Sequence, residues 1–553
     1  MQARSAHTAH WRLRWAGRTL RTFRQRVEGG GVPELIRDRL AAREQNFLWT
    51  AEHLIFANPN SPYRPLLDLA GYDLPKLRQL VFSSGLDQAL DQLCRDGVYV
   101  RVQEFKGVEP IVRRGRTLRV QAKDFVNPSA RGVLHRQSGG SRSSGTVTSI
   151  SMESLLDNVR LRRWMLERYG LLDRDVVVWS TYLSGLNSTV MHTMMGRPPR
   201  RWFSLSGRGV VPGATSDGAP ATSRPISAQG DWATTLLVMA ARMMTGLPVP
   251  RPVEMPADRV VEVARAISEM RAPQGILVKS FVNSALSLVL AADEAGLNLG
   301  DVAFLVGGEP LTPAKRRQFE DRGFKVYSNF GFSEFGGGGW LCPLGTEADD
   351  MHVLTDRVAL RQYSRVVDRD GDTVPAYLFT GLLPHMRNVA LNLESGDYGG
   401  LEERRCGCFL EEAGLRLHMH TVRSFEKLTA EGMAFIGPAL INLLEETLPR
   451  EFGGDGRHYQ LVEGEDGQGR TRVFVLVSPQ LGGVDEDAVR RTVLREIGGT
   501  HLSTAEGALI QQIWDRANTV QVLRREPLAT SAGKIMHLHR DRGELRSAGN
   551  GQR

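Results

Sequence analysis

The sequence predicts an α/β protein. A large N-terminal domain with mixed and parallel sheets flanked by helices is expected, followed by a small α+β C-terminal domain. Residues 301–330 follow a strand–helix–strand pattern, and beyond about residue 428 a helix, a hairpin, a second helix and a strand follow one another. A chain of 553 residues is also too long for one ordinary hydrophobic core. We therefore expect two units of unequal size.

The strand–helix–strand unit is the clearest local pattern in the large domain. Residues 301–308 (DVAFLVGG) are predicted to form a strand that ends in two glycines, and residues 324–330 (FKVYSNF) a second strand. Between them, Thr312 suits an N-cap, Pro313 suits the first helical turn and Gly323 suits the helix end. Because such crossovers join parallel strands, we expect ligands at the carboxyl ends of these strands.

Weaker patterns complete the expected organisation, with no internal repeat. In the large domain they predict helices over 33–56 and 152–170, strands over 97–105 and 175–185, and Gly/Ser-rich loops over 134–150 and 206–228. In the small domain they predict a helix over 441–449, a hairpin over 459–479, a helix over 485–498 and a last strand over 519–527. The expected domain division is 1–130 and 131–427 for the two parts of the large domain, and 428–553 for a mobile C-terminal domain.

Composition argues against several classes of protein. The net charge of +8 comes from 70 basic and 62 acidic residues, and the dispersed arginines favour a compositional bias over a nucleic-acid-binding patch. No apolar run approaches the roughly 18 residues of a membrane span. Residues 1–27 contain no acidic residue, and we expect a basic leading helix with Trp11, Trp15 and Leu20 packed inward rather than a targeting peptide. We therefore expect a cytoplasmic protein that binds neither nucleic acid nor membranes.

Three segments carry residue types that suit nucleotide binding. In residues 137–145 (QSGGSRSSG), glycines let the backbone approach a phosphate, to which N–H groups and hydroxyls donate. Residues 328–334 (SNFGFSE) end a strand with an aromatic ring that can stack on adenine and a carboxylate that can hold Mg²⁺. Residues 525–534 (REPLATSAGK) place a lysine, a mobile charge, on a loop. Each segment alone also fits an ordinary surface loop or turn.

In this order and spacing, the three segments resemble the adenylate-forming superfamily of acyl-CoA synthetases, peptide-synthetase adenylation domains and luciferases. The nearest branch is that of phenylacetate–CoA ligases and their capsule-biosynthesis relatives, over roughly residues 130–540. The resemblance implies that a small acid, usually a carboxylic acid, is activated by ATP and Mg²⁺ as an acyl-adenylate and then transferred to a thiol, most often that of CoA. It also implies a C-terminal domain that rotates between the two half-reactions.

The resemblance assigns roles residue by residue. Lys534 matches the lysine of the first half-reaction, Glu334 the Mg²⁺ carboxylate and Asp397 the aspartate that bonds the ribose hydroxyls. Arg423 matches the arginine before the interdomain hinge, and Phe330 stands where the family usually has an aromatic beside the base. The other residues assigned to ATP are Ser138, Gly139, Gly140, Ser141, Arg142 and Ser143 in the phosphate loop, Gly308, Glu309 and Pro310 along the adenine, and Asn329, Gly331 and Ser333 beside Phe330.

The chain departs from the family pattern in three places. The phosphate loop lacks the usual Thr-Thr-Gly core and the lysine that often follows, and Arg142 stands there instead. Phe330 replaces the commoner tyrosine, and Glu394 and Ser395 replace a usual basic residue before the Gly-Asp pair. These departures bear on the identity of the acid and of the acceptor.

The sparse cysteines point to a metal site. Cys342, His352, Cys406 and Cys408 form a C-x9-H…C-x-C set, and soft thiolates with one imidazole suit tetrahedral Zn²⁺ in a closed structural site. Relatives in the branch have similar positions. The alternative is a set of buried, inert cysteines with an unrelated histidine. We expect zinc to tie the loop after Glu334 to the strand region before the hinge; Cys94 is expected in the core.

Four functional hypotheses stay open. The preferred one is adenylation of a small acid followed by transfer to CoA. The acceptor could instead be an amine or a carrier-protein thiol, and the oxyacid could be nitrite, activated for N–N bond formation. The fourth is a non-catalytic adenylate-fold partner protein, favoured by the altered phosphate loop and opposed by Glu334, Asp397 and Lys534. A homodimer is a further candidate assembly.

Overall fold

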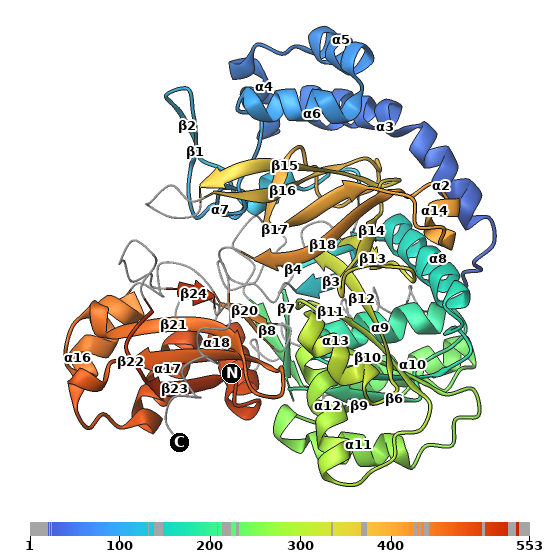
Figure 1. Cartoon of the computed structure of the whole chain (residues 1–553). Helices are drawn as coiled ribbons and strands as arrows, with labels where there is room; N and C mark the ends of the chain where they lie inside the picture. The colour runs from blue at the N-terminus through green and yellow to red at the C-terminus, as the bar shows by residue number, and fades with distance from the viewer. Residues whose placement is uncertain are drawn as a thin grey trace, which may run out of the picture.

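The computed structural model describes fifteen stretches of the chain. They are residues 20, 23, 25–130, 132–137, 147–206, 208–212, 223–227, 232–332, 336–366, 373–424, 428–430, 433–435, 442–499, 504–528 and 538–540. These residues form a large α/β unit and a small C-terminal unit, so the predicted fold class is confirmed (Figure 1). Trp11, Trp15 and the division near residue 427 lie outside the described residues, whereas Leu20 packs against the core of the large unit.

A 12-stranded mixed sheet forms the centre of the large unit, in the order β15-β16-β17-β18-β14-β13-β12-β11-β10-β5-β6-β9. Its parallel half consists of β5 (Asp175–Ser180), β6 (Arg201–Ser204), β9 (Pro252–Glu254), β10 (Ile276–Phe281), β11 (Val302–Gly307) and β12 (Lys325–Phe332). Its antiparallel half consists of β13 (Gly336–Leu341), β14 (Met351–Val353), β15 (Val358–Val366), β16 (Thr373–Gly381), β17 (Leu393–Glu403) and β18 (Leu417–Ser424). The change of direction falls at β12, where the predicted nucleotide residues begin.

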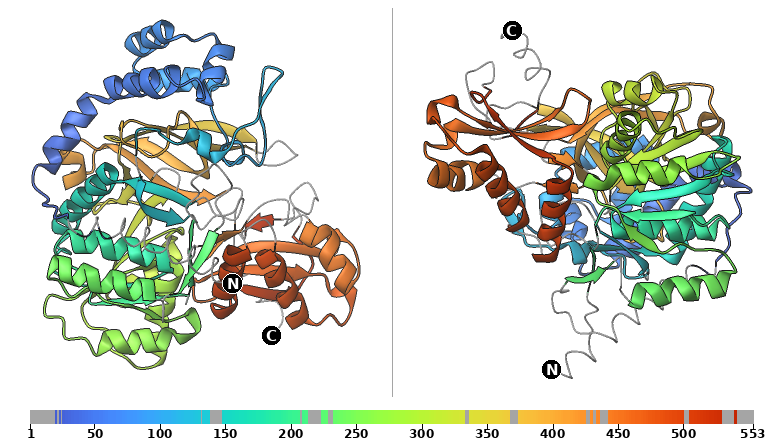
Figure 2. Two further views of the ribbon diagram at one scale, coloured as in Figure 1. Left: turned by 180° about the vertical axis from the view of Figure 1, so that it is seen from behind. Right: turned by 90° about the horizontal axis from the view of Figure 1, so that it is seen from below.

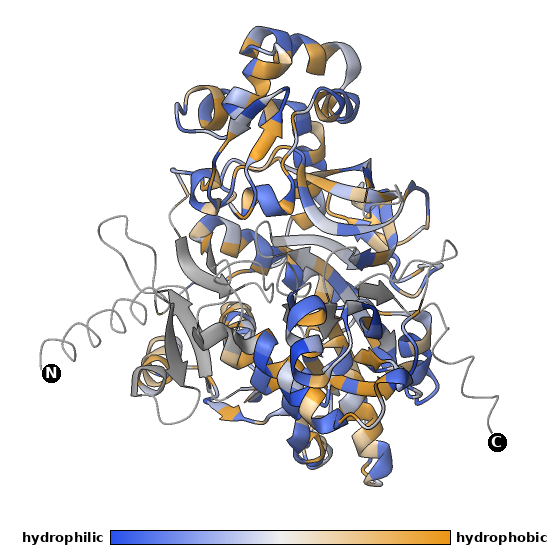
Figure 3. Cartoon of the chain, turned by 90° about the vertical axis from the view of Figure 1, so that its left-hand side faces the viewer, coloured by the Kyte–Doolittle hydropathy of each residue, from blue (hydrophilic) through white to orange (hydrophobic). Residues whose placement is uncertain are grey.

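Helices cover both faces of the parallel half, as its continuous apolar strands require. Val176 and Val178 of β5 pack among α8 (Met152–Arg168), α9 (Tyr182–Met194) and α10 (Trp232–Thr245). Val177 and Trp179 point to the other face, among α11 (Val260–Ser268), α12 (Val282–Glu294) and α13 (Pro313–Glu320). Hydrophilic and hydrophobic residues alternate in bands along the outer helices, because each helix buries only one face (Figure 3).

The predicted strand–helix–strand unit is present. β11 and β12 are parallel neighbours joined by α13, and the Thr312 hydroxyl accepts a hydrogen bond from the backbone N–H of Lys315 at 3.3 Å. The glycine that follows the helix, Gly323, has a φ of +78°, a conformation that favours glycine.

The antiparallel half lies under a layer of N-terminal helices (Figure 1). These are α3 (Arg43–Thr50) with the π-helix Ala51–Phe56 that continues it, α4 (Tyr63–Ala70), α5 (Leu74–Ser84) and α6 (Leu86–Arg95). The preceding helix, α2 (Val32–Ala41), packs instead against α8. The helical prediction for 33–56 is confirmed; helix α6 packs on β15. Cys94, expected in the core, is only half-buried.

The strand predicted over 97–105 is wrong. Only Val100 makes a single β-bridge, with Leu393, and Val102–Phe105 forms the short helix α7. The buried Glu104 carboxylate accepts a hydrogen bond from the backbone N–H of Arg101 at 2.8 Å and pairs with Arg113 at 2.9 Å, which closes a helical turn instead of a strand.

The two segments predicted as Gly/Ser-rich loops contain strands in their described parts. Antiparallel pairs flank each of them, β3 (Gly132–Gln137) with β4 (Val147–Ser151) and β7 (Arg208–Pro212) with β8 (Ser223–Ser227). A further small hairpin pairs β1 (Ile111–Arg113) with β2 (Arg116–Leu118). The strand predicted over 175–185 ends earlier, at Ser180, because Tyr182 begins helix α9.

The C-terminal unit has its own four-stranded sheet, β23-β22-β21-β24. Its members are β21 (Tyr459–Glu465), β22 (Thr471–Val477), β23 (Val520–Arg524) and β24 (Leu538–Arg540), with the π-helix Leu443–Thr447, α16 (Leu448–Phe452), α17 (Glu486–Gly499) and α18 (Thr504–Arg516). The predicted hairpin and second helix are confirmed. Two predictions are corrected: α18 was missed, and β24 follows the strand that we expected to be the last.

The C-terminal unit lies beside the large unit and touches it through the β21–β22 hairpin (Figure 2). The Thr312 hydroxyl donates to Glu465 Oε1 at 2.6 Å, and Lys315 Nζ donates to the Thr471 hydroxyl at 2.6 Å. The hairpin therefore meets the start of α13, next to the carboxyl end of β11.

In the part of the chain that the structure describes, no helix is long and apolar enough to cross a membrane. The chain also forms a short pair of β19 (Leu428–Ala430) with β20 (Met433–Phe435).

Candidate functional site

A pocket lies where the carboxyl ends of β11 and β12 meet the end of β18. It encloses about 660 Å³ of empty space, part of it open to solvent, which is within the range of small-molecule sites. The lining residues are Gly308, Glu309, Pro310, Leu311, Ser328, Asn329, Phe330, Gly331, Asp349, Met351, Asp397, Val422, Arg423, Ser424 and Glu463. The structure thus brings together eight of the residues that the sequence assigned to ATP: Gly308, Glu309, Pro310, Asn329, Phe330, Gly331, Asp397 and Arg423.

Close packing of β11 on β12 shapes the floor of the pocket. A Cβ on Gly307 would lie 2.8 Å from Asn329 Oδ1 and 2.9 Å from the Asn329 carbonyl oxygen, so no other residue fits there. Gly308 follows with a φ of +82°, which turns the chain away from the sheet. Lys279 Nζ donates to Asn329 Oδ1 at 3.4 Å and holds that side chain at the strand end.

Two side chains at the pocket are held by partners outside it. The buried Glu309 carboxylate accepts a hydrogen bond at 2.7 Å from the backbone N–H of Asn283, in the first turn of α12, where the helix dipole favours a negative charge. The Phe330 ring stacks on Phe379, with 6.0 Å between ring centroids and 13° between the ring planes. Contacts within the protein therefore fix the orientations of both side chains.

Asp397 is a further buried carboxylate of the pocket. Its Oδ1 accepts a hydrogen bond from the hydroxyl of Ser424, the residue that faces it across the β17–β18 pair, and its backbone N–H donates to Ser395 Oγ at 3.2 Å. Glu394, one of the departures from the family pattern, bonds instead to the Tyr363 hydroxyl and to Arg365 Nε at 3.1 Å. The unusual acid thus has a structural ion pair.

Residues 138–143, Ser333, Glu334 and Lys534 lie outside the described residues. Sequence reasoning also missed pocket residues, chiefly Asp349, Ser424 and Glu463. Ser424 could have been found as the direct neighbour of Arg423, whereas Asp349 and Glu463 carry no local pattern and are brought in by the fold.

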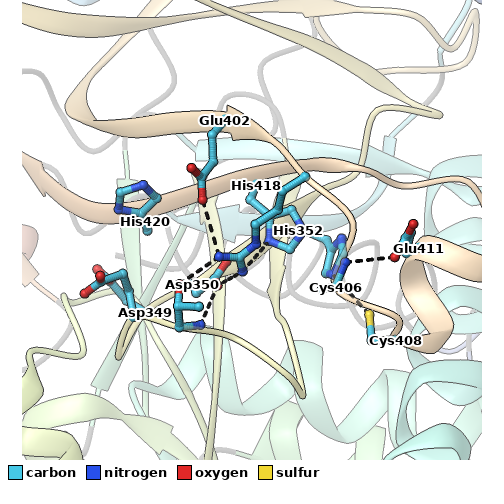
Figure 4. A network of polar contacts seen from close by, with 12 residues as sticks. Asp349, Asp350, His352, Glu402, Cys406, Cys408, Glu411, His418 and His420 are labelled. Atoms are coloured by element: carbon cyan, nitrogen blue, oxygen red, sulfur yellow. Dashed lines mark hydrogen bonds and ion pairs between the residues drawn. The ribbon is translucent and has the colours of Figure 1, made fainter.

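The four candidate metal ligands form one compact cluster. The sulfur atoms of Cys342, Cys406 and Cys408 and a ring nitrogen of His352 all lie within 4.8 Å of one another. His352 Nε2 is 3.1 Å from Cys408 Sγ and 3.5 Å from Cys406 Sγ (Figure 4). Cys342 follows β13, His352 lies in β14, and Cys406 and Cys408 precede the short helix α14 (Phe409–Glu412). The fold therefore gathers the four residues from three separate segments.

The surroundings of the cluster fit a tetrahedral metal. His352 Nδ1 lies 2.8 Å from the carbonyl oxygen of Leu415, which orients the ring with Nε2 toward the sulfurs. The backbone N–H groups of Cys406 and Gly407 donate to Glu411 Oε2 at 2.8 and 2.7 Å and hold the Cys-x-Cys turn. The hydrogen bond from the Cys342 thiol lowers the pKa of Cys408 below its usual range, so this sulfur carries a negative charge more readily than its partner. Three sulfurs and one imidazole in a mostly buried cluster are the donor set of a structural zinc site.

A buried polar network adjoins the cluster. His418 Nδ1 is 2.8 Å from Asp350 Oδ1, Arg404 also pairs with Asp350, and the His418 and His352 rings lie 4.0 Å apart (Figure 4). Burial raises the pKa of Asp350, but hydrogen bonds from His418, Thr346 and Arg404 outweigh it and lower this pKa to about 2. Asp350 is therefore an ionised anchor within the network.

Comparisons with known proteins give only distant likenesses. No protein-family model matches this chain, and no curated protein matches it significantly. A solved 2-hydroxyisobutyryl-CoA ligase, in complex with 2-HIB-AMP and CoA in the thioesterification state, is 15% identical over 94% of this chain and 93% of its own, with a TM-score of 0.49. The amide bond synthetase McbA from Marinactinospora thermotolerans is 13% identical over 75% of this chain and 98% of its own, with a TM-score of 0.31. A Brucella canis acyl-CoA synthetase is 14% identical over 86% and 97%, with a TM-score of 0.23. At these values the likenesses carry no conclusion about activity.

Proposed function

We propose that this chain is an ATP-dependent, AMP-forming acid ligase. It activates a small carboxylic acid as an acyl-adenylate with release of pyrophosphate and then passes the acyl group to a thiol, that of CoA. One observation carries the proposal: residues from four separate segments, assigned to ATP from the sequence alone, line one pocket. Unrelated loop residues would have no reason to meet in this way.

The described residues supply binding and orientation. The Asp397 carboxylate, fixed by Ser424, is the acceptor for the ribose hydroxyls. The Phe330 ring, fixed by Phe379, lies along the adenine, beside the backbone of Gly308 and Glu309. Because these groups are held before the nucleotide arrives, little ordering is needed when it binds.

The chemical step is assigned from the sequence. An oxygen of the acid attacks the α-phosphorus of ATP, and pyrophosphate leaves. The 138–143 loop with Arg142 holds the phosphates, Lys534 stabilises the charge that develops, and Glu334 is the residue that would hold Mg²⁺. Bound Mg²⁺ would neutralise phosphate charge at that place.

We further propose that Cys342, His352, Cys406 and Cys408 hold a structural Zn²⁺. The donor set and the orientation of His352 by Leu415 support this. The metal would link the ends of β13 and β14 to the segment between β17 and α14, and so join strands on both sides of the pocket. Its role is structural, because all four positions around it are taken by the protein.

The proposal is tested by ATP–pyrophosphate exchange. The purified protein is incubated with ATP, Mg²⁺ and labelled pyrophosphate, with aryl, fatty and amino acids and nitrite in parallel, and the adenylate is identified by mass spectrometry. Exchange with one carboxylic acid, followed by thioester formation when CoA is added, is the expected result. Exchange that depends on nitrite would replace the carboxylic acid of this proposal with nitrite. A product that forms only with an amine or a carrier protein would replace CoA as the acceptor. ATP binding without exchange for any acid would contradict the ligase activity.

A further inference from the structure

A single loop, residues 342–350, connects the cysteine–histidine cluster to the nucleotide pocket. It starts at Cys342, and His352 follows it by two residues, so candidate metal ligands stand at both of its ends. The backbone N–H of Cys342 donates to the carbonyl oxygen of Asp350 at 2.8 Å, which closes the loop. A Cβ on Gly345 would lie 2.9 Å from Asp350 Cβ, so the loop is also tightly packed inside. The loop is thus tied to the cluster at both ends and packed within itself.

Two neighbouring aspartates at the end of this loop contact different parts of the structure. Asp350 accepts hydrogen bonds within the cluster region, from the Thr346 N–H at 3.0 Å and from the His418 and Arg404 side chains. Asp349 belongs to the pocket, and Figure 4 shows its carboxylate turned away from the cysteines. Its Oδ1 accepts from the backbone N–H of Thr421 at 2.8 Å and its Oδ2 from that of Val422 at 3.0 Å.

The strand that Asp349 holds is irregular at this point. Thr421 has a φ of +53°, a left-handed conformation that a β-branched residue rarely adopts, and the β17–β18 register shifts between Tyr398 and Gly400. A carboxylate that accepts two successive N–H groups is the partner that fixes such a bend. Without it, the end of β18 would relax toward regular strand geometry.

The residues that follow the bend are the pocket residues. Arg423 Nη1 donates to Asp349 Oδ2 at 3.2 Å, and Ser424 donates to the Asp397 carboxylate. Asp349 therefore positions the Arg423 side chain directly, and it positions the Asp397 carboxylate indirectly, through Ser424. Both lie in the pocket, and Asp349 is 4% exposed, so solvent cannot replace its hydrogen bonds.

We infer that Asp349 is a positioning residue for nucleotide binding and that it makes this binding depend on the cysteine–histidine cluster. The inference rests on the proposed function, since it assumes that the pocket takes ATP. Asp349 acts by holding the end of β18, and the loop holds Asp349 in turn. A metal bound at the cluster thereby raises the affinity of the pocket for ATP.

The test compares three variants of the full-length protein. Asp349→Ala removes the anchor. Asp349→Asn keeps one oxygen, which can accept from the N–H of either Thr421 or Val422, but loses the second acceptor and the charge. Glu347→Gln changes an exposed carboxylate of the same loop as a control. Dissociation constants for ATP are measured by calorimetry, with KM and kcat for exchange, zinc content and Tm alongside. We expect D349A to weaken ATP binding about tenfold or more, as the loss of a charge-assisted hydrogen bond does, with KM rising more than kcat falls and zinc content unchanged. The ATP affinity of D349N should fall between those of the wild type and D349A, and E347Q should bind ATP as tightly as the wild type.

A second arm tests the dependence on the cluster. Removing the metal with a chelator is expected to weaken ATP binding by the wild type and to add little in D349A, because the link is already cut in that variant. Equal weakening of both proteins, or a wild type purified without metal, would overturn the link to the cluster. Unchanged ATP affinity and KM in D349A would overturn the positioning role while leaving the proposed function intact. A wild type that binds no ATP would overturn the proposed function and this inference with it.

Discussion

The Ser424 hydroxyl donates a hydrogen bond to the Asp397 carboxylate across the β17–β18 pair. This contact fixes the orientation of the Asp397 carboxylate in a pocket that it shares with Phe330 and Glu309. A carboxylate held in this way is suited to accept hydrogen bonds from a pair of ribose hydroxyls.

Asp397→Ala is therefore expected to weaken ATP binding by about 10- to 100-fold, the cost of a hydrogen bond to a charged group. Calorimetry with ATP and with 2′-deoxy-ATP measures this loss of affinity. The wild type should prefer ATP, and the variant should bind the two alike. Asp301→Asn is the matched control, because Asp301 pairs with Arg174 at the surface, with 69% of its side chain exposed. A variant that still prefers ATP as strongly as the wild type would show that Asp397 does not contact the ribose.

The metal assignment predicts about one zinc ion per chain. Cys408→Ser should lower zinc content, measured by atomic emission, and should lower Tm, because metal binding stabilises the folded state. Cys94→Ser is the control, since Cys94 lies in α6, outside the cluster. Wild-type protein without zinc, or equal loss in both variants, would refute the site.

Stability should depend on pH through Asp157. Its carboxylate lies 2.7 Å from Arg39 and 2.9 Å from His385 Nε2, and 11% of its side chain is exposed. Burial alone would raise the pKa of Asp157, but the hydrogen bond from His385 and the charge of Arg39 lower this pKa well below its usual range. A lowered folded-state pKa means that the stabilisation is present above the unfolded value of about 4 and is lost as pH falls toward the folded value.

Asp157→Asn is thus expected to reduce the free energy of unfolding by about 3 kcal/mol at pH 7, as breaking a buried pair does. Urea unfolding at pH 7 and at steps below pH 4 measures the difference from the wild type, which should shrink as the pH falls. Asp293→Asn breaks an exposed pair with Arg322 and should change stability by less than about 1 kcal/mol. A difference that stays constant with pH would contradict the assignment.

The sequence predicted what is encoded in neighbouring residues. The β11–α13–β12 unit followed from two apolar runs, the Thr312 cap and Gly323, all of which act within a few residues. The cluster of Cys342, His352, Cys406 and Cys408, which the structure contains, was predicted differently, from the residue types and from the resemblance to the family branch. Helix α18 could have been found, since Leu509, Ile510, Ile513 and Trp514 follow helical spacing and are buried.

Other features depend on distant parts of the chain. The pattern at 97–105 resembled a strand, but Glu104 pairs with Arg113 and caps a turn. Glu463 reaches the pocket only because the β21–β22 hairpin docks at Thr312 and Lys315. Asp349 matters because β18 passes beside its loop. Such contacts between remote segments leave no local pattern in the sequence.

The central claim is adenylation, and Lys534 tests it most directly. ATP–pyrophosphate exchange with the acid that the wild type accepts is measured for the wild type, Lys534→Ala and the control Lys76→Ala, whose exposed amine donates to the Gly71 carbonyl oxygen. Exchange by the Lys534 variant is expected to fall by about 10² or more while ATP binding and K76A activity are retained, because a preorganised charge is lost. Exchange at the wild-type rate in Lys534→Ala would contradict the central claim.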